Sequence, residues 1–71
     1  MSLGEAIRLS RQKAFFTQQD FAKKRNVALS TVNRWDLSNA QPNMKAMKKL
    51  KEICDEYGID YEIMEKEWLI F

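Results

Sequence analysis

Histidine is absent from this chain of 71 residues, and cysteine and proline occur only once each. Without histidine the chain lacks the side chain that most often acts as a general base near neutral pH, and its two glycines form no glycine-rich phosphate loop. The single cysteine, Cys54, forms no internal disulfide and cannot complete a zinc site without histidine. We therefore expect no enzymatic activity, no metal, no cofactor and a reducing, cytoplasmic compartment.

Long apolar runs are also absent, so we expect neither a signal peptide nor a membrane-spanning segment. The length predicts one domain over residues 1–71, without room for a separate ligand-sensing domain, and we expect no small-molecule ligand. Hydrophobic residues make up 45% of the chain, which is enough for a globular core. A core this small gives little stability unless the protein dimerises or packs efficiently.

Charge is unevenly distributed along the chain, although the net charge is only +2. Residues 1–51 contain eleven Lys or Arg against three acidic residues, whereas residues 52–71 contain one Lys against seven acidic residues. A basic segment followed by an acidic one points to a polyanionic partner for the first segment. Ordinary solvated helix faces explain the same pattern, and charge alone does not separate the two interpretations.

Helical periodicity predominates, and it predicts an all-α fold with five helices. The first helix is expected to begin at Ser2 or Gly4 and to end near Lys13. Thr17 is a good N-cap for the second helix, which we expect to end near Asn26, a residue that tolerates the left-handed conformation. With an acidic residue at the third helical position, the second helix begins with a variant of the capping box.

The remaining three helices are predicted from apolar spacing and from their boundary residues. The third covers about residues 29–37, with Val32 and Trp35 facing inward. The fourth is capped by Asn43 and ends at Gly58, and Asp60 caps the fifth. One apolar stripe is expected along the fourth helix, formed by Met44, Met47, Leu50, Ile53, Cys54 and Tyr57.

Residues 17–42 read TQQDFAKKRNVALSTVNRWDLSNAQP, which is a helix, a tight turn and a second helix. Ala22 provides the small side chain that two steeply crossing helices need where their backbones approach. The segment resembles the lambda-repressor-like, or Cro-like, helix-turn-helix family, also called the xenobiotic response element family, over roughly residues 3–64. The motifs that carry the resemblance are Thr17–Gln18, Phe21–Ala22, Ser30–Thr31–Val32, Arg34–Trp35–Asp36 and Pro42.

This resemblance implies a compact five-helix domain that binds double-stranded DNA and regulates transcription, as a homodimer on a palindrome with half-sites about one helical turn apart. The third helix would then read bases in the major groove. Arg34 is suited to guanine O6 and N7, Asn33 to adenine or phosphate, and Leu29 to a thymine methyl. The alternative is that these are merely exposed helix residues. The implied base-contacting residues are Leu29, Ser30, Asn33 and Arg34.

The resemblance also implies phosphate contacts on either side of the third helix. Near the start of the second helix, backbone N–H groups point outward and attract anions. The family also pairs an Arg at the end of its first helix with an acid at the end of its third, which implies a structural ion pair between Arg11 and Asp36. The implied phosphate-contacting residues are Thr17, Gln18, Asn39, Gln41, Asn43 and Lys45.

The chain departs from the family pattern at several positions. Asn26 replaces the usual glycine of the turn, and Ala28 is a poor cap that leaves the exact start of the third helix open. Arg25 replaces an apolar residue, so either its stem lies along the core with its charge in solvent or the helix rotates slightly. Ser38 replaces a glycine, and Asn39 is expected to take the left-handed conformation instead. The fourth helix is about three residues longer than usual.

Residues 68–71 are entirely apolar and have two interpretations. They either fold back onto the first and fourth helices and close the core, or they form a dimer seam or an anchor for a partner protein. The second interpretation defines an alternative function, in which the chain is an antitoxin or another protein-interaction module. The residues concerned are Trp68, Leu69, Ile70 and Phe71.

Overall fold

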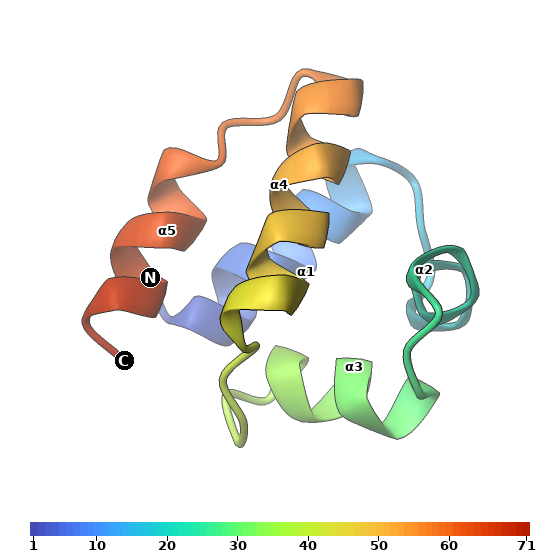
Figure 1. The fold of residues 1–71 in the computed structure, drawn as a ribbon, viewed down its shortest axis with the longest axis horizontal. Coiled ribbons are helices and arrows are strands. Elements are labelled where there is room, and N and C mark those ends of the chain that lie inside the picture. Colours follow the sequence, from blue (N-terminus) through green and yellow to red (C-terminus); the bar gives the residue numbers. More distant parts are fainter.

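The computed structural model describes residues 1–71 and contains five α-helices and no strand (Figure 1). The all-α class and the five predicted helices are confirmed. No helix has both the length and the apolar character that a membrane crossing requires. The helices are α1 (Leu3–Lys13), α2 (Gln18–Arg25), α3 (Leu29–Asp36), α4 (Met44–Tyr57) and α5 (Glu62–Leu69).

Helix α1 begins with a complete capping box. The Ser2 side chain accepts a hydrogen bond from the Glu5 backbone N–H, and the Glu5 carboxylate accepts one from the Ser2 backbone N–H. These hydrogen bonds lower the pKa of Glu5. The buried face of α1 carries Leu3, Ala6 and Ile7 and packs against both α3 and α5, so α1 holds the fold together from within.

Helix α2 is defined by its two ends. Thr17 and Asp20 form a second capping box, and Asn26 takes the left-handed conformation with φ 53°, as the sequence predicted. Only Phe21 and Ala22 of the helix are buried. The small Ala22 side chain is compatible with the packing of α2 against α3 that the sequence predicted.

Helix α3 begins at Leu29 although Ala28 makes no side-chain cap hydrogen bond. Tertiary contacts therefore hold this helix, because Val32 and Trp35 are buried, as predicted. After α3 the structure corrects one expectation. The left-handed residue is Ser38, with φ 59°, rather than Asn39, and the Ser38 hydroxyl accepts a hydrogen bond of 3.0 Å from the Gly4 backbone N–H.

Helix α4 has the predicted Asn43 cap and the predicted left-handed Gly58 at its end, with φ 66°. The predicted apolar stripe is shorter than expected, because Met44 is 76% exposed and Tyr57 is 43% exposed. Both lie at the ends of the helix, where less of the neighbouring structure covers them. The buried part of the stripe is Met47, Leu50, Ile53 and Cys54.

Helix α5 starts one residue later than a simple Asp60 cap predicts. The N-cap position is occupied by Tyr61, but the Asp60 carboxylate still accepts a hydrogen bond of 2.9 Å from the Glu62 backbone N–H. Near its end, Trp68 packs against the core and its indole N–H donates to the carbonyl of Pro42 at 2.6 Å. Residues 69–71 are exposed, so only the start of the apolar tail closes the core.

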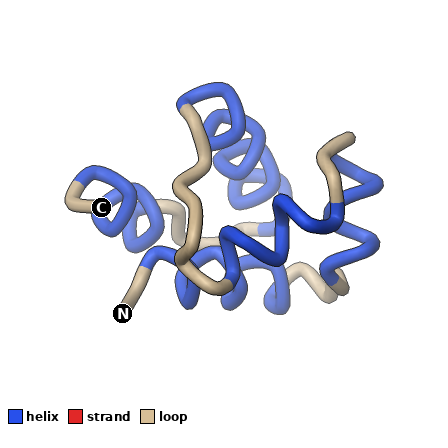
Figure 2. Tube along the Cα trace, turned by 90° about the horizontal axis from the view of Figure 1, so that it is seen from below, coloured by secondary structure: helices blue, strands red, loops and turns tan.

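The five helices surround one core of 13 buried residues to which every helix contributes. Figure 2 shows the same arrangement from below, with α5 and the C-terminus at one side of the molecule. In Figure 1, α3 lies along the lower edge, α4 begins close to it, and α4 ends at the opposite edge. One long side of α3 is therefore free of other helices. The core consists of Leu3, Ala6, Ile7, Ala14, Phe21, Ala22, Val32, Trp35, Met47, Leu50, Ile53, Cys54 and Met64.

Candidate nucleic-acid interface

The outer side of α3 is a row of exposed residues on an anchored helix. Val32 is completely buried and Trp35 is 6% exposed, which holds the helix against the core. On the opposite side, Asn33 and Arg34 are exposed, and no hydrogen bond or ion pair within the chain involves the Arg34 guanidinium. The helix therefore presents an unpaired cation on the side opposite its buried residues. All four predicted base-contacting residues are exposed: Leu29, Ser30, Asn33 and Arg34.

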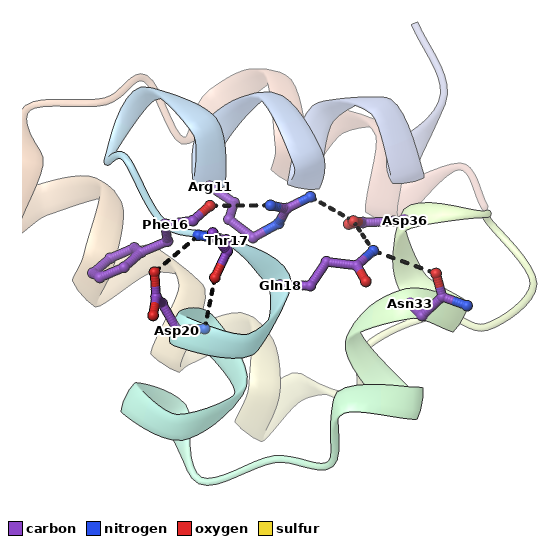
Figure 3. Close-up of polar contacts among 7 residues, drawn as sticks. All are labelled: Arg11, Phe16, Thr17, Gln18, Asp20, Asn33 and Asp36. Atoms are coloured by element: carbon purple, nitrogen blue, oxygen red, sulfur yellow. Dashed lines mark hydrogen bonds and ion pairs between the residues drawn. The ribbon is translucent and has the colours of Figure 1, made fainter.

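A buried ion pair joins α1 to the end of α3. Arg11 Nη2 lies 2.6 Å from Asp36 Oδ2, and the two side chains are only 7% and 3% exposed. Arg11 Nη1 also donates to the carbonyl of Phe16 at 3.0 Å, so the guanidinium ties the α1–α2 turn to the same cluster (Figure 3). Removing one partner of a buried pair destabilises a protein much more than removing one partner of a surface pair, because the remaining charge is buried and unpaired.

Gln18, the first residue of α2, links this buried pair to the exposed side of α3. Its side-chain Nε2 donates to Asp36 Oδ2 at 2.7 Å and to Asn33 Oδ1 at 3.3 Å. Figure 3 shows the three side chains in sequence, from the buried carboxylate outward. The Gln18 side chain therefore donates both of its hydrogen bonds within the protein.

The other residues predicted to contact phosphate lie at helix starts and in the α3–α4 loop. Thr17 Oγ1 and Asn43 Oδ1 accept backbone hydrogen bonds at the starts of α2 and α4. The Gln41 side chain donates to the carbonyl of Trp68 at 2.8 Å, which ties the loop to α5. Asn39 and Lys45 are exposed. The predicted residues thus lie on both flanks of α3, at the start of α2 and at the start of α4.

An open groove of about 400 Å³ separates α3 from the beginning of α4. Trp35 and Ala46 contribute apolar surface, whereas Lys45 and Lys49 contribute positive charge. The acidic end of α4 lies at the opposite edge of the molecule from α3 (Figure 1). The remaining lining residues are Val27, Thr31, Ala40, Gln41 and Asn43.

Two contacts that position these helices were not predicted. A Cβ atom at Gly4 would collide with the backbone carbonyl of Asp36 and would lie 2.7 Å from that of Trp35, so only glycine allows α1 to approach the end of α3. A glycine inside a predicted helix was the available signal, because such a residue usually has a packing reason.

Arg25 is the second contact that the sequence did not predict. Its guanidinium lies 3.8 Å from the Glu52 carboxylate and 3.9 Å from that of Glu56, with a side chain only 15% exposed. One of the two expected arrangements left this charge in solvent, whereas the guanidinium is directed at α4. Arg25 thus provides an ionic link between α2 and α4.

Comparison with known proteins found no match among family models, curated proteins or solved structures. No group of three or more His, Cys, Asp or Glu side chains is placed to hold a metal ion. The shifted pKa values lie outside α3, at Glu5, Cys54 and Tyr61.

Proposed function

We propose that this chain is a lambda-repressor-like helix-turn-helix protein that binds double-stranded DNA in a sequence-specific way and regulates transcription without catalysis. The observation that carries the proposal is the two-sided character of α3. Val32 and Trp35 anchor it in the core, while Asn33 and Arg34 project from its free side. A helix in this arrangement fits the major groove with its polar side toward the bases.

Base recognition is assigned to the exposed residues of α3. The guanidinium of Arg34 has two N–H donors in the geometry that guanine O6 and N7 accept. Ser30 and Asn33 lie one turn apart on the same helix side and reach neighbouring bases. Leu29, 48% exposed, is placed to contact a thymine methyl group.

Phosphate contacts are assigned to the two flanks of α3. The start of α2 offers the backbone N–H of Gln18 and the Thr17 hydroxyl. The opposite flank offers the amide side chains of the α3–α4 loop and the ammonium group of Lys45. Such contacts hold the register of the protein on the duplex and make affinity fall as salt rises. The loop residues concerned are Asn39, Gln41 and Asn43.

A homodimer on a palindrome is part of this proposal. The Cα trace extends 27 × 26 × 20 Å. These dimensions are compatible with two copies side by side on one face of the duplex, on half-sites about 34 Å apart. The exposed apolar residues at the end of α5 supply a surface for this contact: Leu69, Ile70 and Phe71.

Selection of bound sequences from a random DNA pool tests the function directly. We expect one enriched motif with two inverted half-sites, and an affinity for that motif that decreases steeply between low and moderate salt. A pool that shows no enriched sequence at moderate salt contradicts the proposal. Enrichment of a single half-site supports DNA reading and contradicts the dimer.

A protein-interaction role, as in an antitoxin, is the second candidate. The observation in its favour is that Leu69, Ile70 and Phe71 are 69%, 71% and 57% exposed, a concentration of apolar surface at one end of the molecule. In this case the tail holds a partner protein and DNA binding is secondary. Removing residues 69–71 separates the two roles when binding to a single half-site is measured, because that binding needs the exposed side of α3 and not the dimer.

A further inference from the structure

The loop between α3 and α4 has few hydrogen bonds of its own. Residues 40–42, in the middle of this loop, take part in no backbone–backbone hydrogen bond. Pro42 has no N–H to donate. A segment without backbone hydrogen bonds keeps one conformation only if other groups hold it. In Figure 1 the loop reaches the same lower edge of the molecule as α3, the helix proposed to enter the major groove.

Trp68 of α5 makes both of the hydrogen bonds that residues 40–42 form. Its indole N–H donates to the carbonyl of Pro42 at 2.6 Å, and its backbone carbonyl accepts from the side chain of Gln41 at 2.8 Å. The Trp68 carbonyl lies in the last turn of α5, where carbonyl groups lack a helical partner, and Gln41 supplies one. Because the Trp68 ring packs against the core, both bonds start from a fixed point.

Packing alone does not hold the exposed part of this loop. Pro42 is fully buried, but Ala40 is only half-buried and Gln41 is exposed. The bond to Trp68 uses one N–H of the Gln41 amide and leaves the other N–H at the surface. A side chain that is already held loses less conformational entropy when it binds a phosphate. The two bonds to Trp68 therefore prepare the loop for binding.

We propose that Trp68 is a positioning residue for DNA binding, which holds residues 40–42 in the conformation in which the loop contacts the sugar–phosphate backbone. The inference rests on the proposed DNA-binding function and adds a residue of α5 to those on which affinity depends. Both polar groups of Trp68 are bonded to the loop, so it acts through Gln41 and Pro42. Phosphate contacts carry no sequence information, so Trp68 affects affinity and not base preference.

Replacing Trp68 with phenylalanine tests this role, because the change keeps an aromatic ring and removes the indole N–H. Ile59→Ala is the matched control. It also removes packing next to α5, but Ile59 lies beside Leu9 of α1 and away from the loop. The DNA is a duplex that carries the motif selected from the random pool, and each variant is first shown to be folded by circular dichroism.

We expect the affinity of Trp68→Phe for this duplex and for its site variants to fall about three- to tenfold, equally on all of them. The affinity of Ile59→Ala should stay within about twofold of the wild type, because a folded protein with an intact loop binds normally. A changed base preference in Trp68→Phe contradicts a role confined to phosphate contacts.

Interference by ethylated phosphates shows which phosphates each variant uses. Gln41→Ala first identifies the phosphates that depend on the loop. We expect Trp68→Phe to lose interference at those same phosphates and to keep it at the phosphates beside the start of α2. Ile59→Ala should keep both sets. Loss on one flank alone is a result that a general effect on stability does not produce.

Three interference results overturn the inference. A complete pattern in Trp68→Phe means that the loop keeps its conformation without the indole hydrogen bond. A loss shared by both flanks means that Trp68 acts through the stability of the whole domain. A complete pattern in Gln41→Ala means that the loop does not meet the phosphates.

A measurement on the free protein separates this inference from the proposed function. We expect the indole N–H of Trp68 to exchange with solvent much more slowly in the folded protein than in urea, because it is bonded to the Pro42 carbonyl. Equal exchange rates contradict that bond, and the inference with it, whatever the protein binds. Slow exchange combined with no enriched DNA motif overturns the DNA-binding function and the positioning role, while the link between α5 and the loop stands.

Discussion

Arg11 and Asp36 form the shortest ion pair of the molecule, with 2.6 Å between Nη2 and Oδ2, at a contact between α1 and the last residue of α3. The next shortest pair, Lys51 with Asp55, is at 3.3 Å and is more than half exposed. The two pairs differ in solvent access, and this difference predicts very different contributions to stability. All four residues lie in helices, so a difference in helix propensity does not explain a difference between the two pairs.

We expect Arg11→Met to lower the free energy of unfolding by about 3–5 kcal/mol, because Asp36 is left charged and buried. Lys51→Met is the matched control and should change it by less than about 1 kcal/mol. Urea denaturation followed by circular dichroism measures both. The double variant Arg11→Met with Asp36→Leu should recover part of the loss, and a double variant that is less stable than the single one contradicts this explanation.

Gly4→Ala is expected to destabilise the protein by about 1–3 kcal/mol, because the added methyl group meets the backbone carbonyls of Asp36 and Trp35. The sign of this change in stability distinguishes a close contact from an open helix surface. In a helix without such contacts, replacing glycine with alanine stabilises by up to about 1 kcal/mol. Thermal unfolding measures the change, and an increase in the melting temperature would show that α1 does not approach α3 this closely.

Arg34→Ala should weaken binding to the selected DNA site by about 1–3 kcal/mol and relax the preference at one base pair. The reason is the loss of the free guanidinium on the outer side of α3. Arg8→Ala on the exposed side of α1 removes the same charge and serves as control. Fluorescence anisotropy on a set of site variants makes the measurement. An equal loss on all of them would reduce Arg34 to a phosphate contact.

Removing residues 69–71 should change the free energy of unfolding by less than about 1 kcal/mol, because all three side chains are mostly exposed. Trp68→Ala should cost about 2 kcal/mol or more, since it removes core packing and the hydrogen bond to Pro42. Sedimentation analysis of the truncated chain then reports on the dimer. A truncated chain that unfolds would show that the exposed tail belongs to the core.

Cys54 should be nearly inert to iodoacetamide in the folded protein at pH 8 and reactive in concentrated urea. Its side chain is buried, and burial raises the pKa of the thiol. A pKa raised by folding stabilises the protein below the unfolded value, about 8.5, and this contribution is lost as pH rises further. The alkylation rate tests the first statement, and equal rates in the folded and the urea-unfolded protein would contradict it. The melting temperature between pH 8 and pH 10 tests the second statement, and no decrease over this range would contradict it.

Local signals predicted most of the helix boundaries correctly. Thr17 with Asp20, Asn26, Asn43 and Gly58 define helix ends through bonds or conformations that involve only a few neighbouring residues, so the pattern of residue types was sufficient. The exposed positions of α3 followed from the same reasoning. Once Val32 and Trp35 face inward, the remaining residues of a regular helix have no choice of side.

The local signals could not predict contacts between residues that are far apart in the sequence. Ser38 takes the left-handed conformation while its hydroxyl is bonded to Gly4, 34 residues earlier in the chain. Arg25 turns to the acids of α4 rather than to solvent. The ends of the apolar stripe on α4 are exposed because the helix is longer than the part that neighbouring helices cover. The periodicity of apolar residues in one helix does not show how much of that helix is covered.

The five helices and their caps follow from the amino-acid sequence alone, because they depend on interactions within about four residues. The candidate residues of α3 came from the resemblance to the helix-turn-helix family. The close approach of α1 to α3 at Gly4 and the direction of the amides of Gln18 and Asn33 follow only from tertiary structure. The physical reason is that each depends on Asp36, whose carboxylate and carbonyl oxygens meet groups from other helices. These contacts form only when the helices pack together, and the packing depends on the whole chain.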